Sequence, residues 1–233
     1  MLRLILTTLS AGAVLSSPAW GFADNAPSIT PAPNAGESIV FDVYRDGDKR
    51  MGTHAVHFEQ DGDDLLVSVD IALRAGLGPI TVFRYEHQST ERWREGQLIG
   101  LNAETLKDGE TYRVEAQSTQ DGLDVEGETP DMGAISLEFP LSVLPSSHWR
   151  GYRTGAYDIL NTEHGSELDV TVDYLGEEML AADGARITAH RYRLSSELTV
   201  DLWYDENGRW AGCQFEARGQ TIRYERRADP LRG

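Results

Sequence analysis

The sequence has one cysteine, Cys213, and an excess of acidic over basic residues. A single cysteine cannot form an intramolecular disulfide, so we expect the fold to be held together by its core alone. The 21 Lys and Arg are outnumbered by 38 Asp and Glu, which gives a formal net charge of −17. This balance disfavours nucleic acid and anionic membrane surfaces as partners, and it equally fits plain solubility.

Catalytic signatures are also missing. The sequence contains no Gly-x-Ser-x-Gly elbow, no His-Glu-x-x-His, no phosphate-binding loop and no dinucleotide fingerprint. His54 and His57 are three residues apart, which places them on opposite faces of a strand and not around one metal ion. His87 shares a strand face with aromatic residues and is interpreted as a core histidine. We therefore predict no catalytic residue, no metal ligand and no cofactor.

The one long apolar run, Leu4–Leu15, stands at the N-terminus behind an arginine. It is shorter than the roughly 20 residues of a transmembrane helix. Gly21 and Ala23 supply the small residues of a cleavage site, and Ala19 ends a second possible site. We expect residues 1–23 to be a signal peptide cut near Ala23, which predicts a periplasmic or secreted protein without a transmembrane segment in the mature chain. No cysteine stands directly after either possible cleavage site, which argues against a lipid-anchored lipoprotein.

Acidic-Gly and Asn-Gly dipeptides recur along the remainder of the chain, between runs in which apolar and polar residues alternate. Such dipeptides tolerate the positive φ of tight hairpin turns. The turns are Asp46-Gly47, Asp61-Gly62, Glu95-Gly96, Asp108-Gly109, Asp121-Gly122, Asp183-Gly184 and Asn207-Gly208. This pattern predicts an antiparallel meander of roughly ten to twelve strands. We expect a flexible linker over 24–36, a single β domain over 37–228 and a short tail over 229–233.

The predicted fold class is all-β, with a single curved antiparallel sheet that forms an incomplete barrel. One stretch, Pro140–Trp149, is apolar but lacks strand alternation and is bounded by prolines. We expect an irregular or short helical crossover around 140–160 that closes one end of the sheet. Cys213 alternates with Ala211 and Phe215, which predicts a buried, unreactive thiol on an apolar face.

A family resemblance covers most of the mature chain. It rests on the segments Phe41–Gly47, Met51–His54, Ser146–Trp149, Val200–Trp210 and Gln220–Tyr224. These segments resemble an uncharacterised family of exported proteobacterial proteins, classed as a domain of unknown function. More distantly, a hydrophobic strand that ends in an aromatic-Asp turn resembles the periplasmic lipoprotein-carrier proteins. That resemblance implies a half-barrel with a lid over an apolar cavity, and it transfers no catalytic residue.

The favoured hypothesis is non-enzymatic binding of an apolar or amphipathic ligand, such as a lipid or acyl chain, on the concave face of the sheet. The expected lining residues are Trp149, His148, Phe83, Tyr85, Trp203 and Tyr204. Two alternatives stay open. One is an envelope scaffold or assembly protein that uses a sheet edge or an acidic face. The other is a small-molecule hydrolase or lyase centred on His148 with Ser147 or a strand carboxylate. A filled interior would favour the scaffold, and polar groups converging around a histidine would favour the enzyme.

Overall fold

A computed structural model describes residues 34–77 and 80–228 of the chain. The predicted signal peptide, most of the predicted linker and the predicted tail lie outside the described residues. Within the described part, the chain forms fourteen strands and no helix, and so no helix there could cross a membrane. The strands are β1 (Ser38–Arg45), β2 (Lys49–Asp61), β3 (Asp64–Leu77), β4 (Ile80–Arg94), β5 (Gln97–Lys107), β6 (Glu110–Ser118), β7 (Leu123–Thr129), β8 (Gly133–Phe139), β9 (Gly155–Leu160), β10 (Glu167–Ala182), β11 (Ala185–Ser195), β12 (Thr199–Asp205), β13 (Trp210–Ala217) and β14 (Gln220–Arg226).

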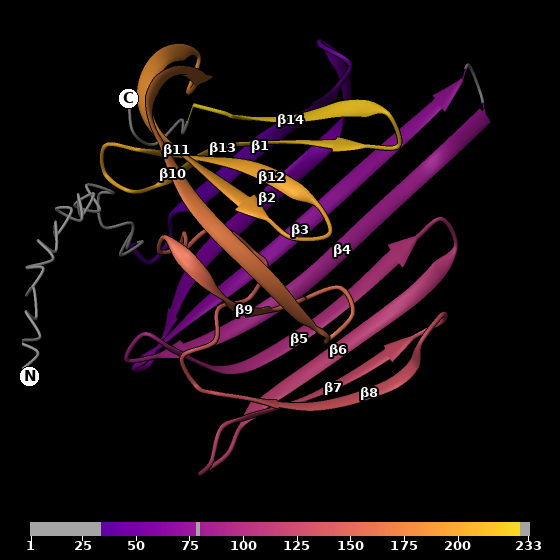
Figure 1. The fold of residues 1–233 in the computed structure, drawn as a ribbon, viewed down its shortest axis with the longest axis vertical. Coiled ribbons are helices and arrows are strands. Elements are labelled where there is room, and N and C mark those ends of the chain that lie inside the picture. The colour runs from indigo at the N-terminus through magenta and orange to yellow at the C-terminus, as the bar shows by residue number, and fades with distance from the viewer. Residues whose placement is uncertain (1–33, 78–79, 229–233) are drawn as a thin grey trace, which may run out of the picture.

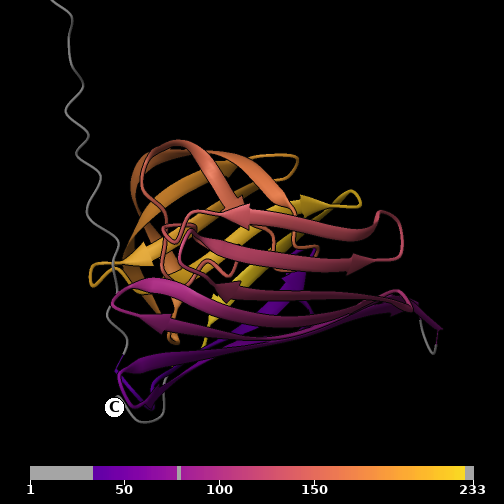
Figure 2. The ribbon, with the colours of Figure 1, turned by 90° about the horizontal axis from the view of Figure 1, so that it is seen from below.

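All fourteen strands belong to one antiparallel sheet. Each strand pairs with its neighbour in the chain, except that β8 and β9 are unpaired with each other and β1 pairs with β14. Figure 1 shows the result, a sheet that curls until its two ends come to the same side of the molecule. Figure 2 shows the β2–β5 part and the β9–β12 part of the sheet facing each other. The prediction of an all-β incomplete barrel is confirmed.

The predicted turns are confirmed as hairpins. Asp46, Glu95, Asp108 and Asp183 adopt φ values between 44° and 55°, and each is followed by a glycine with positive φ. The predicted number of strands was too low, because β8 and β9 went unrecognised. The alternation signal was present in β8, since apolar Ile135, Leu137 and Phe139 alternate with polar Ser136 and Glu138, and it was overlooked. The β9 sequence was assigned to the irregular crossover. The irregular segment is shorter than expected and spans residues 140–154, which we call the plug.

The sheet overlaps itself where a barrel would close. The turn between β9 and β10 packs against the inner face of β6 and β7, where the His164 ring stacks on Tyr112 with centroids 5.2 Å apart. Gly127 of β7 is needed there, since a Cβ atom would lie 2.4 Å from the carbonyl oxygen of His164. Because the β9–β10 turn lies on the inner face of β6 and β7, β9 does not pair with β8. The barrel therefore has an unsealed seam between β8 and β9.

A second, smaller core forms on the outer face of the sheet. Beyond a register shift at Tyr174–Gly176, the end of the β10–β11 hairpin bends over β12 and β13. Trp203 and Ala211 are buried beneath it. The hairpin tip is held by Arg226, which is 6% exposed and donates to the Asp183 carboxylate at 2.6 Å.

This second core corrects the predicted alternation of β13. A register shift between Trp203 and Tyr204 pairs Tyr204 with Trp210 and Trp203 with Gly212. Ala211 consequently faces the outer core, whereas Cys213 faces the main core. The prediction that these two residues share a face was wrong, because a bulge shifts the alternation by one residue.

Cys213 itself is buried as predicted, with 3% exposure. Burial raises the pKa of its thiol, so the reactive thiolate is disfavoured. We expect the native protein to resist labelling by a thiol reagent such as DTNB at pH 8, and the same protein in 6 M guanidinium chloride to react at once. Rapid labelling of the native protein would place Cys213 at the surface.

Candidate functional site

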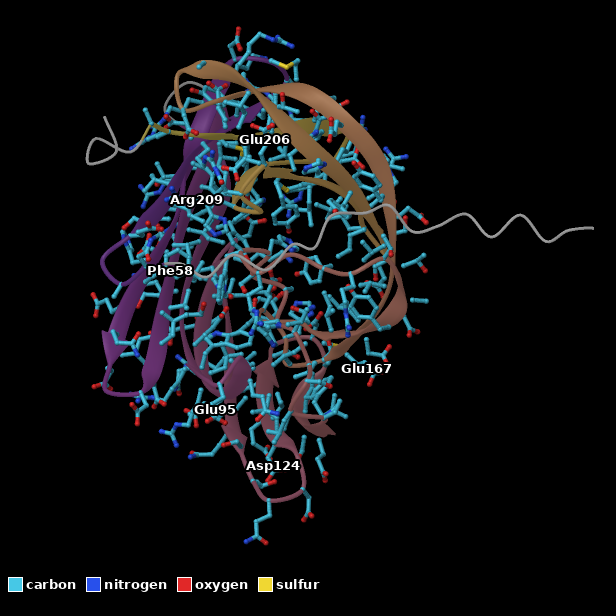
Figure 3. The ribbon with its side chains drawn as sticks, turned by 90° about the vertical axis from the view of Figure 1, so that its left-hand side faces the viewer. Phe58, Glu95, Asp124, Glu167, Glu206 and Arg209 are labelled. Carbon is cyan, nitrogen blue, oxygen red and sulfur yellow. The ribbon has the colours of Figure 1, made fainter. Side chains whose placement is uncertain are left out.

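The plug crosses the inside of the curled sheet. Trp149 is 2% exposed, and its ring meets those of Phe58 and Trp93 edge-on with centroids 5.2 Å and 5.6 Å apart. Leu160 of β9 pairs with the plug, since its N–H donates to the Leu144 carbonyl at 2.9 Å. Phe58 belongs to the main core. In Figure 3 its strand lies across the molecule from the β10–β11 hairpin, and side chains occupy the space between them. The plug therefore belongs to the main core.

A buried carboxyl group fixes Trp149 in place. Glu91 of β4 is fully buried, and its Oε2 accepts the indole N–H of Trp149 at 2.9 Å and that of Trp93 at 2.8 Å. Its Oε1 has no partner at hydrogen-bonding geometry among the described residues. Burial raises the pKa of Glu91, while the two indoles and the nearby Ser147 hydroxyl act to lower it. The bond from Trp149 ties the plug to β4, whereas the bond from Trp93 lies within β4 and holds the carboxyl group in position.

The next plug residue extends this contact to the rim. The Arg150 guanidinium lies over the Trp93 ring at 4.5 Å and donates to the Gly96 carbonyl oxygen at 2.6 Å. A cation over an indole face is attracted by the ring quadrupole. The plug is thus held both inside the barrel and at the β4–β5 turn.

His148 has a structural set of partners. Its backbone adopts φ 65°, and its carbonyl oxygen accepts the Tyr204 hydroxyl at 2.8 Å. The Tyr152 hydroxyl donates to the Pro145 carbonyl at 3.1 Å, so Nδ1–H of His148 is the donor in its 2.8 Å contact with Tyr152. Burial lowers the pKa of His148 to about 4. The imidazole is therefore neutral at pH 7.

The geometry does not pair Ser147 with His148. The hydroxyl of Ser147 lowers the pKa of Glu91, whereas the imidazole of His148 is hydrogen-bonded to Tyr152. A serine nucleophile needs a base within hydrogen-bond reach. The described residues around the plug do not provide that arrangement.

A second buried histidine lies deeper, on β2. The ring of His54 is surrounded by Phe41, Trp210 and Tyr224, with centroids 5.1 to 6.0 Å away. Neither ring nitrogen has a hydrogen-bond partner among the residues that the structure describes. Burial lowers the pKa of His54 to about 3. His57 lies on the outer face, bonded to Ser38 at 2.7 Å, so the prediction of opposite faces is confirmed.

His87 is satisfied, as predicted for a core histidine. It is 4% exposed, and its Nδ1 lies 2.7 Å from the Thr105 hydroxyl. Burial lowers the pKa of His87 to about 4. Because Nδ1 is already hydrogen-bonded to Thr105, that nitrogen is not free to bind a metal ion.

The six residues expected to line a ligand site do not form one surface. Trp149, His148 and Tyr204 meet at the plug. Trp203 faces the outer core, where its Nε1 donates to Glu178 at 2.6 Å. Adjacent strand residues point to opposite faces, so Trp203 and Tyr204 cannot both line the interior.

Phe83 and Tyr85 lie at the other end of the barrel, where both are partly exposed. The Arg218 guanidinium stands over the Phe83 ring at 5.1 Å and pairs with Asp108 at 2.8 Å. Sequence reasoning missed the residues that connect this interior, above all Glu91, His54 and Trp210. A signal for Glu91 was present, because the alternation from Phe83 to Trp93 places it on the apolar face.

A hollow of about 750 Å³ lies on the outer surface. It runs across β2–β6, and its lining mixes polar side chains such as Asp70, Asn102 and Glu104 with apolar ones such as Ala55 and Val69. By contrast, the small hollow lined by Pro145, His148 and Tyr152 has no room for a water molecule. Three exposed carboxylates lie close together on β9 and β10 and could hold a metal ion: Asp158, Glu167 and Asp169.

The family model for a domain of unknown function, DUF6134, matches residues 41–227. The chain belongs to the DUF6134 family. Among solved structures, this DUF6134 chain is similar to a beta-barrel-like protein of another domain of unknown function, DUF1849, from Brucella abortus. The sequence identity is 9%, the TM-score is 0.57, and the match covers 81% of this chain and 94% of the other. At that identity the likeness concerns the fold alone. No curated protein matches the sequence.

Proposed function

We propose that this DUF6134 protein is an exported, non-enzymatic interaction protein of the cell envelope, in which a rigid barrel presents its surface to a partner. The observation that supports the proposal is the plug. Trp149 and the bonds to Glu91 occupy the centre of the barrel, where a container would need free volume. Export is supported by the leader over residues 1–23.

The chemistry at the plug also favours an interaction protein over an enzyme. Ser147, His148 and Glu91 each have structural partners, and they do not converge on a space where a substrate could lie. Catalytic groups need a reacting atom within about 3 Å. The surface hollow and the seam are, by contrast, open to a macromolecule.

The binding of an amphipathic ligand, such as a lipid or acyl chain, is a second candidate. It is favoured by the end of the barrel opposite the plug, where Phe83 is partly exposed beneath the Arg218 guanidinium and Phe215 is also partly buried. An apolar group flanked by a guanidinium suits a ligand with an acyl chain and an anionic head. In this version the plug is a structural floor and the ligand occupies the other end.

Native mass spectrometry separates the two candidates. The protein is purified without detergent from the periplasm of the bacterium that produces it. We expect a mass that corresponds to the chain cut after Ala23, with no stoichiometric small molecule. A bound lipid that disappears from Phe83→Asp and persists in the surface variant Glu59→Lys would instead establish the container. Recovery of intact Met1 in the cytoplasm would contradict export.

A further inference from the structure

The free edge of β8 has the properties of a peptide-binding strand. We propose that β8 binds an extended peptide as an added strand at the seam, and that this peptide carries basic residues on its outward side and apolar residues on its inward side. The inference rests on the proposed function and names the chemistry of the partner.

The backbone of β8 is available on one side. β8 pairs with β7 and with no other strand of the described chain, and five of its seven residues are exposed. A methyl group at Gly122 would lie 2.5 Å from the Phe139 carbonyl oxygen, so that carbonyl is directed toward β7. Antiparallel ladders alternate, so the backbone groups of Ala134, Ser136 and Glu138 are directed to the seam. Those groups offer a ladder of donors and acceptors for another strand.

The opposite edge does not compete for them. Part of β9 is already covered, because the Ser146 N–H donates to the Leu160 carbonyl at 2.9 Å and Leu144 accepts the Leu160 N–H. The β9–β10 turn is also packed inside β6 and β7. Closing the seam would require that turn to leave the interior, so β8 remains an edge in the folded protein.

The edge lacks the usual protection against strand addition. Natural edge strands are commonly interrupted by proline, lysine or a bulge. Gly133–Phe139 contains neither proline nor a basic residue, and its pairing with β7 is regular over the whole strand. An unprotected edge of seven residues is long enough to bind a peptide by main-chain hydrogen bonds.

The side chains beside the edge specify the partner. Leu137 on the inner face is 40% exposed and Met132 at the β7–β8 turn is 52% exposed, so the inward residues of a partner strand would meet apolar surface. The outer face of β7 and β8 is acidic. Its carboxylates are Asp124, Glu126, Glu128 and Glu138. Figure 3 places Asp124 at the outer end of this surface.

Among the described residues, little of this negative charge is neutralised by basic side chains. Arg113 approaches Glu128 at 3.6 Å and is shared with Glu104. Glu126 accepts a hydrogen bond from the uncharged Ser136 at 2.9 Å. A partner strand with Lys or Arg at alternate positions would place a cation beside Glu138 of β8, and its other long basic side chains would extend over β8 toward the carboxylates of β7. A second copy of β8 would instead bring like charges together, which disfavours self-pairing.

The probe is a fluorescent nine-residue peptide that alternates Lys and Val, compared with a Glu–Val peptide of the same length. Binding is measured by anisotropy with the full-length mature protein at low ionic strength. We expect the Lys–Val peptide to bind in the micromolar range and the Glu–Val peptide to bind at least tenfold more weakly. The amides of Ala134–Phe139 should gain protection from hydrogen exchange when the Lys–Val peptide is bound.

Two variants separate strand addition from charge attraction. Ser136→Pro removes a seam-directed N–H while the β7 ladder keeps its bonds, and it should weaken binding at least tenfold. Glu138→Lys should weaken binding several-fold, whereas Glu59→Lys, the same charge change on distant β2, should have little effect. Thermal melting of each variant confirms that it is folded.

Several outcomes would overturn the proposal. They are absent binding of the Lys–Val peptide, equal binding by wild type and folded Ser136→Pro, and equal weakening by Glu138→Lys and Glu59→Lys. Dimerisation in analytical ultracentrifugation that Ser136→Pro abolishes would identify a second copy as the occupant and would also overturn it. The proposed function fails separately, through a small molecule bound to the purified protein.

Discussion

Trp149→Ala is expected to lower the free energy of unfolding by about 3–5 kcal/mol, the usual cost of truncating a buried tryptophan. Trp149 is 2% exposed, packs on Phe58 and Trp93, and supplies one of the two indole donors to the buried Glu91. Its loss leaves a cavity and a carboxyl group with fewer partners. Urea denaturation followed by circular dichroism measures the change without relying on tryptophan fluorescence.

Trp149→Phe is the matched control, because it keeps most of the ring volume but removes the indole N–H. It should cost about 1–3 kcal/mol, the penalty for leaving a buried polar group with a lost partner. His148→Ala should cost less than Trp149→Ala, since His148 is partly exposed. An unchanged urea midpoint for Trp149→Ala would show that the plug is not part of the core.

The sequence predicted the all-β incomplete barrel because its two signals are local. Turn dipeptides such as Glu95-Gly96 and Asp183-Gly184 fix hairpins, and apolar alternation fixes which strand face is buried. The same alternation placed His54 and His57 on opposite faces of their strand, as the structure has them. Local signals cannot show that β1 pairs with β14, since that contact depends on how far the whole sheet curls.

The candidate site was harder to predict, because its contacts are distant in the chain. Glu91 and Trp149 are 58 residues apart, and only the folded plug brings them together. A bulge is also invisible to a simple alternation count, which is why Ala211 was placed on the wrong face. The grouping of Trp203 with Tyr204 was an error of a different kind. Strand alternation already separates neighbouring residues.

The interior combines apolar packing with titratable groups that are kept neutral. His54, His87 and His148 have pKa values lowered to about 3, 4 and 4 by burial. Burial acts in the opposite direction on Glu91, whose pKa is raised. Stability should therefore depend on pH through residues that take no part in the proposed peptide edge. A stability test thus probes the barrel interior independently of binding.

The protein is expected to lose stability steeply as pH falls below about 6.5, the ordinary pKa of histidine. The folded state binds protons at these three histidines only near pH 3 to 4, whereas the unfolded chain binds them near pH 6.5. Each histidine therefore lowers the free energy of unfolding by up to about 1.4 kcal/mol per pH unit within that window. The three together lower it by up to about 4 kcal/mol per pH unit. Glu91 offsets part of this loss, because its protonated form is favoured in the folded state.

Carboxylates act in a lower window. Glu163, for example, has a pKa lowered to about 2, so its stabilising effect is lost only as pH falls below about 4.5. A loss of stability between pH 6.5 and 5 therefore reports on the histidines. Urea denaturation at several pH values in this range measures the slope.

His54→Phe is the decisive variant. The ring lies among Phe41, Trp210 and Tyr224, and its two nitrogens have no partner in the described structure, so phenylalanine loses no hydrogen bond there. We expect His54→Phe to be at least as stable as wild type at pH 7 and to lose about one third less stability per pH unit between pH 6 and 5, since one of three titrating groups is removed. His57→Phe, on the outer face of the same strand, should keep the wild-type slope. Identical slopes for wild type and His54→Phe would mean that His54 is solvated, and the interior around Trp210 would then have to be open to water.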